Sequence, residues 1–114
     1  MPLIRKEKRR VLWRDFEKAD NFLKRLIGIM FRRTLDAPMV FYFNRKGRHA
    51  IHSCFCASFD AIYLDEKKKV VDVRDGVPPF TLLVTPKKDA LFLIEAPAGS
   101  ARELNILEGD VLAF

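Results

Sequence analysis

From Met39 onward, short apolar runs alternate with polar turns along the chain. Runs rich in β-branched and aromatic residues are typical of strands, and they lie at 39–43, 49–56, 60–65, 69–75, 80–84 and 90–96. The runs 60–65 and 69–75 flank a short polar turn, which predicts a hairpin. Since short turns rather than crossover helices join the runs, we expect a mostly antiparallel arrangement.

The N-terminal third has a different pattern. The first eight residues, half of which are charged, are expected to fray, and 9–15 is predicted as a strand. Residues 20–29 carry apolar side chains at helical spacing, beginning at Asp20, a favourable N-cap residue. This segment is predicted as a short helix.

At the other end, Ser100 and Glu103 have the spacing of a capping box, which predicts a second short helix. The last apolar run, 111–114, is predicted as a final strand. We therefore expect a single domain, residues 1–114, of mostly β (α+β) class. The predicted architecture is a small antiparallel β-barrel or sandwich of about seven strands with two short helices.

Charge is distributed unevenly along the chain. Residues 1–33 hold 11 Lys and Arg against 4 acidic residues, a net charge of +7, whereas the remaining residues carry −1. A basic N-terminal surface could attract phosphates, an acidic protein or anionic lipid. The candidate anion-binding residues are Arg9, Arg10, Arg32 and Arg33.

Composition adds expectations about environment. Glutamine is absent and charged residues make up 32% of the chain, which favours a heat-adapted source. The chain has neither an apolar leader pattern nor a run long enough to cross a membrane, so we expect a cytoplasmic protein with no membrane partner. In a reducing compartment Cys54 and Cys56 would remain thiols.

Three segments resemble one family in order along the chain. They are "GIMFRRTL" at 28–35, the segment 51–73 beginning "IHSCFC", and "LIEAPAGSARELNILEGDVL" at 93–112. Together they resemble the domain-of-unknown-function family 192 over roughly residues 11–114. The resemblance implies a small β-barrel or sandwich with short helices, and it brings no established activity, catalytic residue or cofactor.

The segment 51–60 holds a histidine, both cysteines and an aspartate. In a strand, His52, Cys54 and Cys56 share one face, with alternate side chains ~6.6 Å apart. Such a spread cannot bring three ligands to within the ~2.0–2.3 Å that zinc requires, and parallel side chains fit a disulfide poorly. We therefore expect no metal site and no cofactor, with the cysteines acting as small buried apolar residues.

A candidate pocket follows from the remaining polar side chains. His52 and Asp60 stand at the two ends of this segment, Glu95 ends an apolar strand, and Met30 and Arg32 follow the predicted helix. These five residues form the predicted pocket, although each also has a structural interpretation, such as a turn-stabilising acid.

Three functions remain open from the sequence. The leading interpretation is a module that binds a small ligand or a protein partner and has a basic N-terminal surface. The first alternative is a small enzyme with a cleft around His52, Asp60 and Glu95. Nucleic-acid binding through the basic N-terminal region is less favoured, because the charge is not interleaved with exposed aromatic residues.

Overall fold

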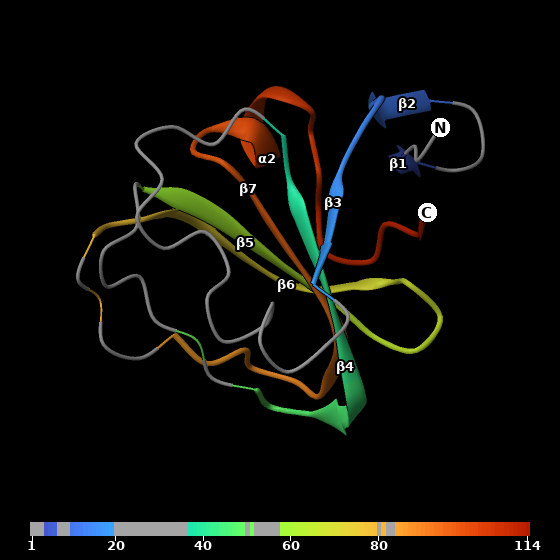
Figure 1. The fold of residues 1–114 in the computed structure, drawn as a ribbon, viewed down its shortest axis with the longest axis vertical. Coiled ribbons are helices and arrows are strands. Elements are labelled where there is room, and N and C mark those ends of the chain that lie inside the picture. The colour runs from blue at the N-terminus through green and yellow to red at the C-terminus, as the bar shows by residue number, and fades with distance from the viewer. Residues whose placement is uncertain are drawn as a thin grey trace.

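The computed structural model describes residues 4–6, 10–19, 37–49, 51, 58–79, 81 and 84–114. Its elements, in chain order, are β1 (Ile4–Lys6), β2 (Arg10–Trp13), β3 (Glu17–Ala19), β4 (Met39–Gly47), β5 (Phe59–Leu64), β6 (Val70–Val77), β7 (Ala90–Pro97), α2 (Ser100–Glu103) and β8 (Leu112–Ala113). They form two sheets, one of three strands in the order β2-β1-β8 and one of five in the order β3-β4-β7-β5-β6 (Figure 1).

The predicted class is confirmed, and the sandwich rather than the barrel is the architecture. Within the described residues the larger sheet keeps two edge strands, β3 and β6, so it is open. Every pair of neighbouring strands is antiparallel except β3 with β4, which run parallel. The second predicted helix is α2, and the first, at 20–29, lies outside the described residues.

Several predicted boundaries are corrected by the structure. Strand β4 continues through residues 44–47, beyond the predicted run 39–43, because Gly47 pairs with Ala90 of β7 after an irregularity in the ladder. Within the first eight residues, Ile4–Lys6 form β1, and Ile4 is fully buried. The predicted 60–65 and 69–75 hairpin is confirmed as β5 and β6.

The predicted capping box is also corrected. Gly99 occupies the N-cap with a φ of 90°, and its carbonyl accepts the Glu103 N–H at 3.0 Å. The Ser100 hydroxyl instead donates to the Pro97 carbonyl at 2.5 Å. The helix therefore starts from a glycine turn, since a left-handed φ is easily adopted without a Cβ.

The larger sheet is packed on both faces. One face contributes Ile62, Leu64 and Ile94 to a core that also includes Ile4, Leu12 and Leu112 of the smaller sheet. The opposite face carries a second apolar cluster around Phe59, Ala61, Tyr63 and Leu93. Burial on both faces explains why all six residues of β5 are buried.

Candidate functional site

The structure describes part of the predicted pocket. Asp60 and Glu95 lie on the neighbouring strands β5 and β7, whereas Met30, Arg32, His52 and the two cysteines lie outside the described residues. Of the candidate anion-binding residues, Arg10 is described and is exposed in β2, and Arg9, Arg32 and Arg33 are outside. Among the described side chains, no three His, Cys, Asp or Glu residues are grouped to hold a metal ion.

Asp60 and Glu95 face opposite sides of the sheet. Asp60 pairs with Ala96, and Glu95 pairs with Ala61. Because side chains alternate along a strand, Asp60 lies on the face of Ile62 and Ala96, and Glu95 lies on the face of Ala61. The two carboxyl groups therefore do not enter one pocket together.

Asp60 joins two segments that lie far apart in the sequence. Its side chain is fully buried, and one carboxylate oxygen accepts the Gly76 N–H at 2.7 Å. The other oxygen accepts the Ala101 N–H of α2 at 2.9 Å. Backbone donors to a carboxylate are strong charge-assisted bonds, so Asp60 fixes α2 against the end of β6.

Two glycines mark the surface beside this contact. Gly76, with a φ of 58°, lies where the β5–β6 register shifts between Phe59 and Ala61. A Cβ added at Gly76 or at Gly99 would meet no atom within 4 Å. Both positions therefore border open space, and their positive φ rather than packing accounts for glycine there.

A cleft runs between β6 and the chain from Gly99 to Glu108. One cavity of about 510 Å³ is lined by Asp60, Asp75, Gly76, Gly99, Arg102 and Glu103. A second, of about 310 Å³, is lined by Val73, Asp75, Ala101, Arg102, Asn105, Ile106, Leu107 and Glu108. Since Asp75 and Arg102 line both, the two cavities are neighbours along this cleft, and each has the size of a small-molecule site.

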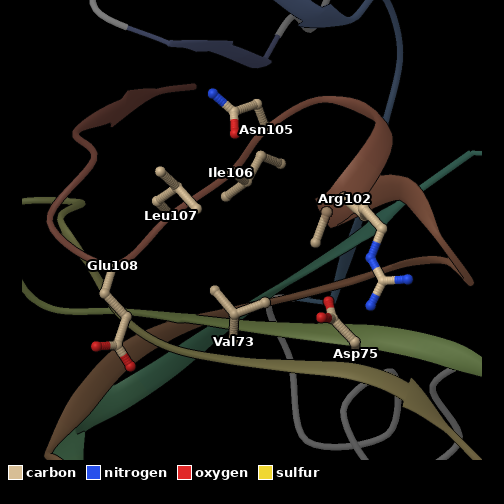
Figure 2. Close-up of a pocket in the computed structure, with 8 residues that line it drawn as sticks. Val73, Asp75, Arg102, Asn105, Ile106, Leu107 and Glu108 are labelled. Atoms are coloured by element: carbon tan, nitrogen blue, oxygen red, sulfur yellow. The ribbon is translucent and has the colours of Figure 1, made fainter.

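Opposite charges face one another where the two cavities meet. Figure 2 shows the guanidinium of Arg102 and the carboxylate of Asp75 pointing toward each other, from α2 and from β6. Within the described residues neither group forms an ion pair, and both side chains are exposed. Both charges are therefore available to a bound molecule.

The second cavity adds apolar surface to these charges. Ile106 and Leu107 lie opposite Val73 in Figure 2. Leu107 is 57% exposed, so apolar surface of this side chain is in contact with water. Glu108, at the other end of the view, is already paired with Lys87.

Glu95 lies in a quite different environment. It is 4% exposed, and no described residue forms a hydrogen bond with its Oε2 atom. Burial raises the pKa of Glu95 to about 8, which favours the protonated, neutral carboxyl. Burial also raises the pKa of the Tyr63 hydroxyl, and the nearby Glu95 adds to that rise.

The sequence predictions did not include most residues of the cleft. Asp75 and Arg102 are ordinary exposed residues, and nothing in their local sequence sets them apart. The only signal in the sequence was a glycine close to a charged residue. Gly76 directly follows Asp75, and Gly99 precedes Arg102 by three positions. A register shift and a long-range hydrogen bond bring these segments together, and neither can be predicted from local spacing.

Two solved structures share the fold. A protein of unknown function from Novosphingobium aromaticivorans superposes with a TM-score of 0.80 at 22% identity, over 87% of this chain and 74% of that one. A Sinorhizobium meliloti protein, described as a candidate transcription regulator, gives a TM-score of 0.81 at 20% identity, over 86% and 79%. At these identities the likeness establishes the fold alone.

Relatives in sequence come from heat-loving archaea. A UPF0127 protein of Thermococcus kodakarensis is 37% identical over 99 residues, which is 84% of this chain and 62% of that protein. The Pyrococcus abyssi UPF0127 protein is 38% identical over 113 residues, or 96% and 95% of the two chains. The chain thus spans less than two thirds of the Thermococcus kodakarensis relative and nearly all of the Pyrococcus abyssi one.

No described helix has the length and apolar character needed to cross a membrane.

The model of the DUF192 family, described as "Uncharacterized ACR", matches residues 3–114, and the predicted resemblance to this family is confirmed. The chain therefore belongs to the DUF192 family.

Proposed function

We propose that this domain is a ligand-binding module whose site is the cleft between β6 and the chain from Gly99 to Glu108. The observation that carries the proposal is the facing pair Arg102 and Asp75, which are exposed, lie where two cavities meet, and have no ion-pair partner among the described residues (Figure 2). A few convergent polar groups beside an apolar wall are typical of small-molecule sites.

The charges favour a zwitterionic ligand. The Arg102 guanidinium suits a carboxylate, which it can hold through two parallel N–H donors. Asp75 and Glu103, which line the same cavity, suit an ammonium group. A ligand with both groups a few atoms apart would satisfy both sides of the cleft.

The apolar wall favours an aliphatic tail on the same ligand. Val73, Ile106 and Leu107 line the second cavity, next to the charged pair. Covering Leu107, which is 57% exposed, would remove apolar surface from water. An aliphatic amino acid, or the equivalent end of a peptide, combines these features.

The enzyme alternative has weaker support. Both oxygens of Asp60 are occupied by backbone N–H groups, and Glu95 faces the other side of the sheet. A general acid or base must come within reach of the proton that it transfers, and neither of the two cavities lined by described residues includes both carboxyl groups. We therefore place the site in the cleft and assign Asp60 a structural role.

The test is an amide-detected NMR titration with leucine, a zwitterion with an aliphatic tail. We expect saturable shifts at Gly76, Gly99 and Leu107, with a Kd on the order of millimolar for so small a ligand. Leucinamide lacks the carboxylate and 4-methylpentanoate lacks the amine, so each should bind more weakly. Glycine, without the tail, should bind more weakly as well.

Matched variants separate the site from general charge effects. Arg102→Ala and Asp75→Asn should each weaken leucine binding severalfold. Arg45→Ala and Asp89→Asn, exposed changes of the same charge outside the cleft, should leave it unchanged. Absence of shifts in the cleft, or equal loss in all four variants, would refute the proposal.

A further inference from the structure

A cluster of aromatic rings with lysines beside it is formed by residues that do not line the cleft. The rings of Tyr42, Phe92 and Phe114 contact one another edge to face, with centroids 5.3–6.1 Å apart. All three side chains are half-buried, so each ring keeps part of its surface at the protein exterior. They come from β4, β7 and the chain after β8.

Two lysines lie over these rings. The Lys68 ammonium is 4.1 Å from the Phe114 centroid and 5.6 Å from that of Phe92. The Lys18 ammonium is 5.9 Å from the Tyr42 centroid. Cations over ring faces are attracted by the ring quadrupole, so the aromatic cluster gathers two positive charges from β3 and from the β5–β6 turn.

Among the residues that the structure describes, neither ammonium is paired with an aspartate or glutamate side chain. The Lys68 ammonium donates to the terminal backbone oxygen of Phe114 at 2.5 Å, which leaves two of its three N–H donors. Burial lowers the pKa of Lys68, and the neighbouring positive charge of Lys18 lowers it further.

The backbone fixes Lys68 in an unfavourable conformation. Its φ is 61°, in the left-handed region where lysine is uncommon and glycine or asparagine is favoured. Its N–H donates to the Asp65 carbonyl at 3.0 Å, and its carbonyl accepts the Leu112 N–H at 2.9 Å. Residues held in such conformations cluster at functional sites, and here the strain fixes where the lysine side chain leaves the turn.

We propose that Lys18 and Lys68 form a binding site for the phosphate of a nucleotide unit, whose base lies against the rings of Tyr42, Phe92 and Phe114. An anion between the two ammonium groups relieves their mutual repulsion. Aromatic rings provide surface for a flat base, as they do in proteins that bind single strands. The site is separate from the cleft and needs a ligand of different chemistry.

The test is a titration with adenosine monophosphate, compared with inorganic phosphate and with adenosine. We expect the nucleotide to shift the NMR signals of Lys18, Lys68 and the three rings, and to bind more tightly than either of its parts. Titrations with oligo(dT) and oligo(dA) then show whether the bound nucleotide is part of a single strand or a free nucleotide. Tighter, salt-dependent binding of oligomers assigns a single strand, whereas affinity equal to that of the mononucleotide assigns a free nucleotide.

Variants at the turn separate binding from folding. Lys68→Gly suits the left-handed φ and removes the charge, so it should fold, by circular dichroism, and lose most nucleotide affinity. Lys68→Arg and Lys67→Ala, the second a charge removal in the same turn, should retain that affinity. If an oligomer binds, each lysine lost should reduce the slope of log K against log salt by about 0.7.

Two results would overturn this proposal. One is that neither the nucleotide nor an oligomer binds at low salt. The other is that Lys67→Ala and Lys68→Gly lose affinity equally, which would mean a diffuse charge effect. Leucine binding in the cleft is unaffected by either result, so this proposal and the proposed function can fail separately.

Discussion

The Asp60 carboxylate of β5 accepts the Ala101 N–H of α2 at 2.9 Å, across 41 positions of the sequence. Its second oxygen holds Gly76, at the end of β6. One buried side chain thus joins the two segments that form the walls of the cleft.

Replacing Asp60 with asparagine should destabilise the domain. The amide keeps one acceptor oxygen, so one of the two backbone N–H groups would be left facing an NH₂ group. An unpaired buried donor costs about 1–3 kcal/mol, and the loss should appear as a lower midpoint in urea unfolding. Asp89→Asn, an exposed change of the same chemistry, should stay within about 0.5 kcal/mol of the wild type. Equal stability of the two variants would contradict the structural role of Asp60.

The buried carboxyl of Glu95 should make stability depend on pH. Its pKa is about 8 in the folded protein and 4.5 in an ordinary environment, so between these values the folded state binds more protons than the unfolded chain. The free energy of unfolding should therefore fall as pH rises from about 4.5 to about 8, by up to about 1.4 kcal/mol per pH unit.

Glu95→Gln should remove this contribution, because glutamine does not titrate. Urea unfolding across the same pH range should show a flatter profile for the variant than for the wild type. Glu103→Gln, an exposed carboxyl in the cleft, serves as the control and should keep the wild-type slope. Parallel profiles for Glu95→Gln and wild type would show that Glu95 is ionised in the folded protein.

Gly99 should be sensitive to substitution for conformational reasons alone. Its φ is 90°, and a Cβ there would meet no atom within 4 Å. Alanine should therefore cost about 1–2 kcal/mol through backbone strain, and asparagine, which tolerates positive φ better, should cost less. Thermal unfolding of the two variants checks this order, and equal losses would indicate a packing clash instead.

Arg102→Ala should scarcely change stability. The side chain is exposed and has no ion-pair partner among the described residues, and such surface changes are usually within ±0.5 kcal/mol. Urea unfolding of Arg102→Ala and of Arg45→Ala should give the same midpoint. A loss of stability confined to Arg102→Ala would mean that the residue supports the fold, and the leucine test would then lose its meaning.

The strands could be predicted from the sequence because their signal is local. Alternation of apolar residues identified the β5–β6 hairpin and most of β7, and the resemblance to DUF192 held over nearly the whole chain. The prediction that Asp60 and Glu95 belong to one pocket depends on more than local pattern. Each residue was placed on a strand, but which face it occupies depends on register between strands, and that register has shifts that no local pattern signals.

The cleft could not be predicted from the sequence, because it is formed by contacts between residues that lie far apart along the chain. Arg102 and Asp75 line the same cavities because Asp60 holds α2 against β6, and no spacing within either segment predicts that arrangement. Glycine beside a charged residue is too common a pattern to select them. The turn at Lys68 is similar, since its left-handed φ at a non-glycine residue is opposite to what the sequence would predict.

The most direct test of the account observes the Arg102 side chain itself during a leucine titration. In protein labelled with ¹⁵N arginine, the Nε–H resonance of Arg102, assigned by its loss in Arg102→Ala, reports whether a carboxylate binds the guanidinium. We predict a saturable shift of this resonance with leucine, a smaller one with leucinamide, and none at Arg45. An Arg102 resonance that does not move at saturating leucine would contradict the central claim that this cleft binds a zwitterionic ligand.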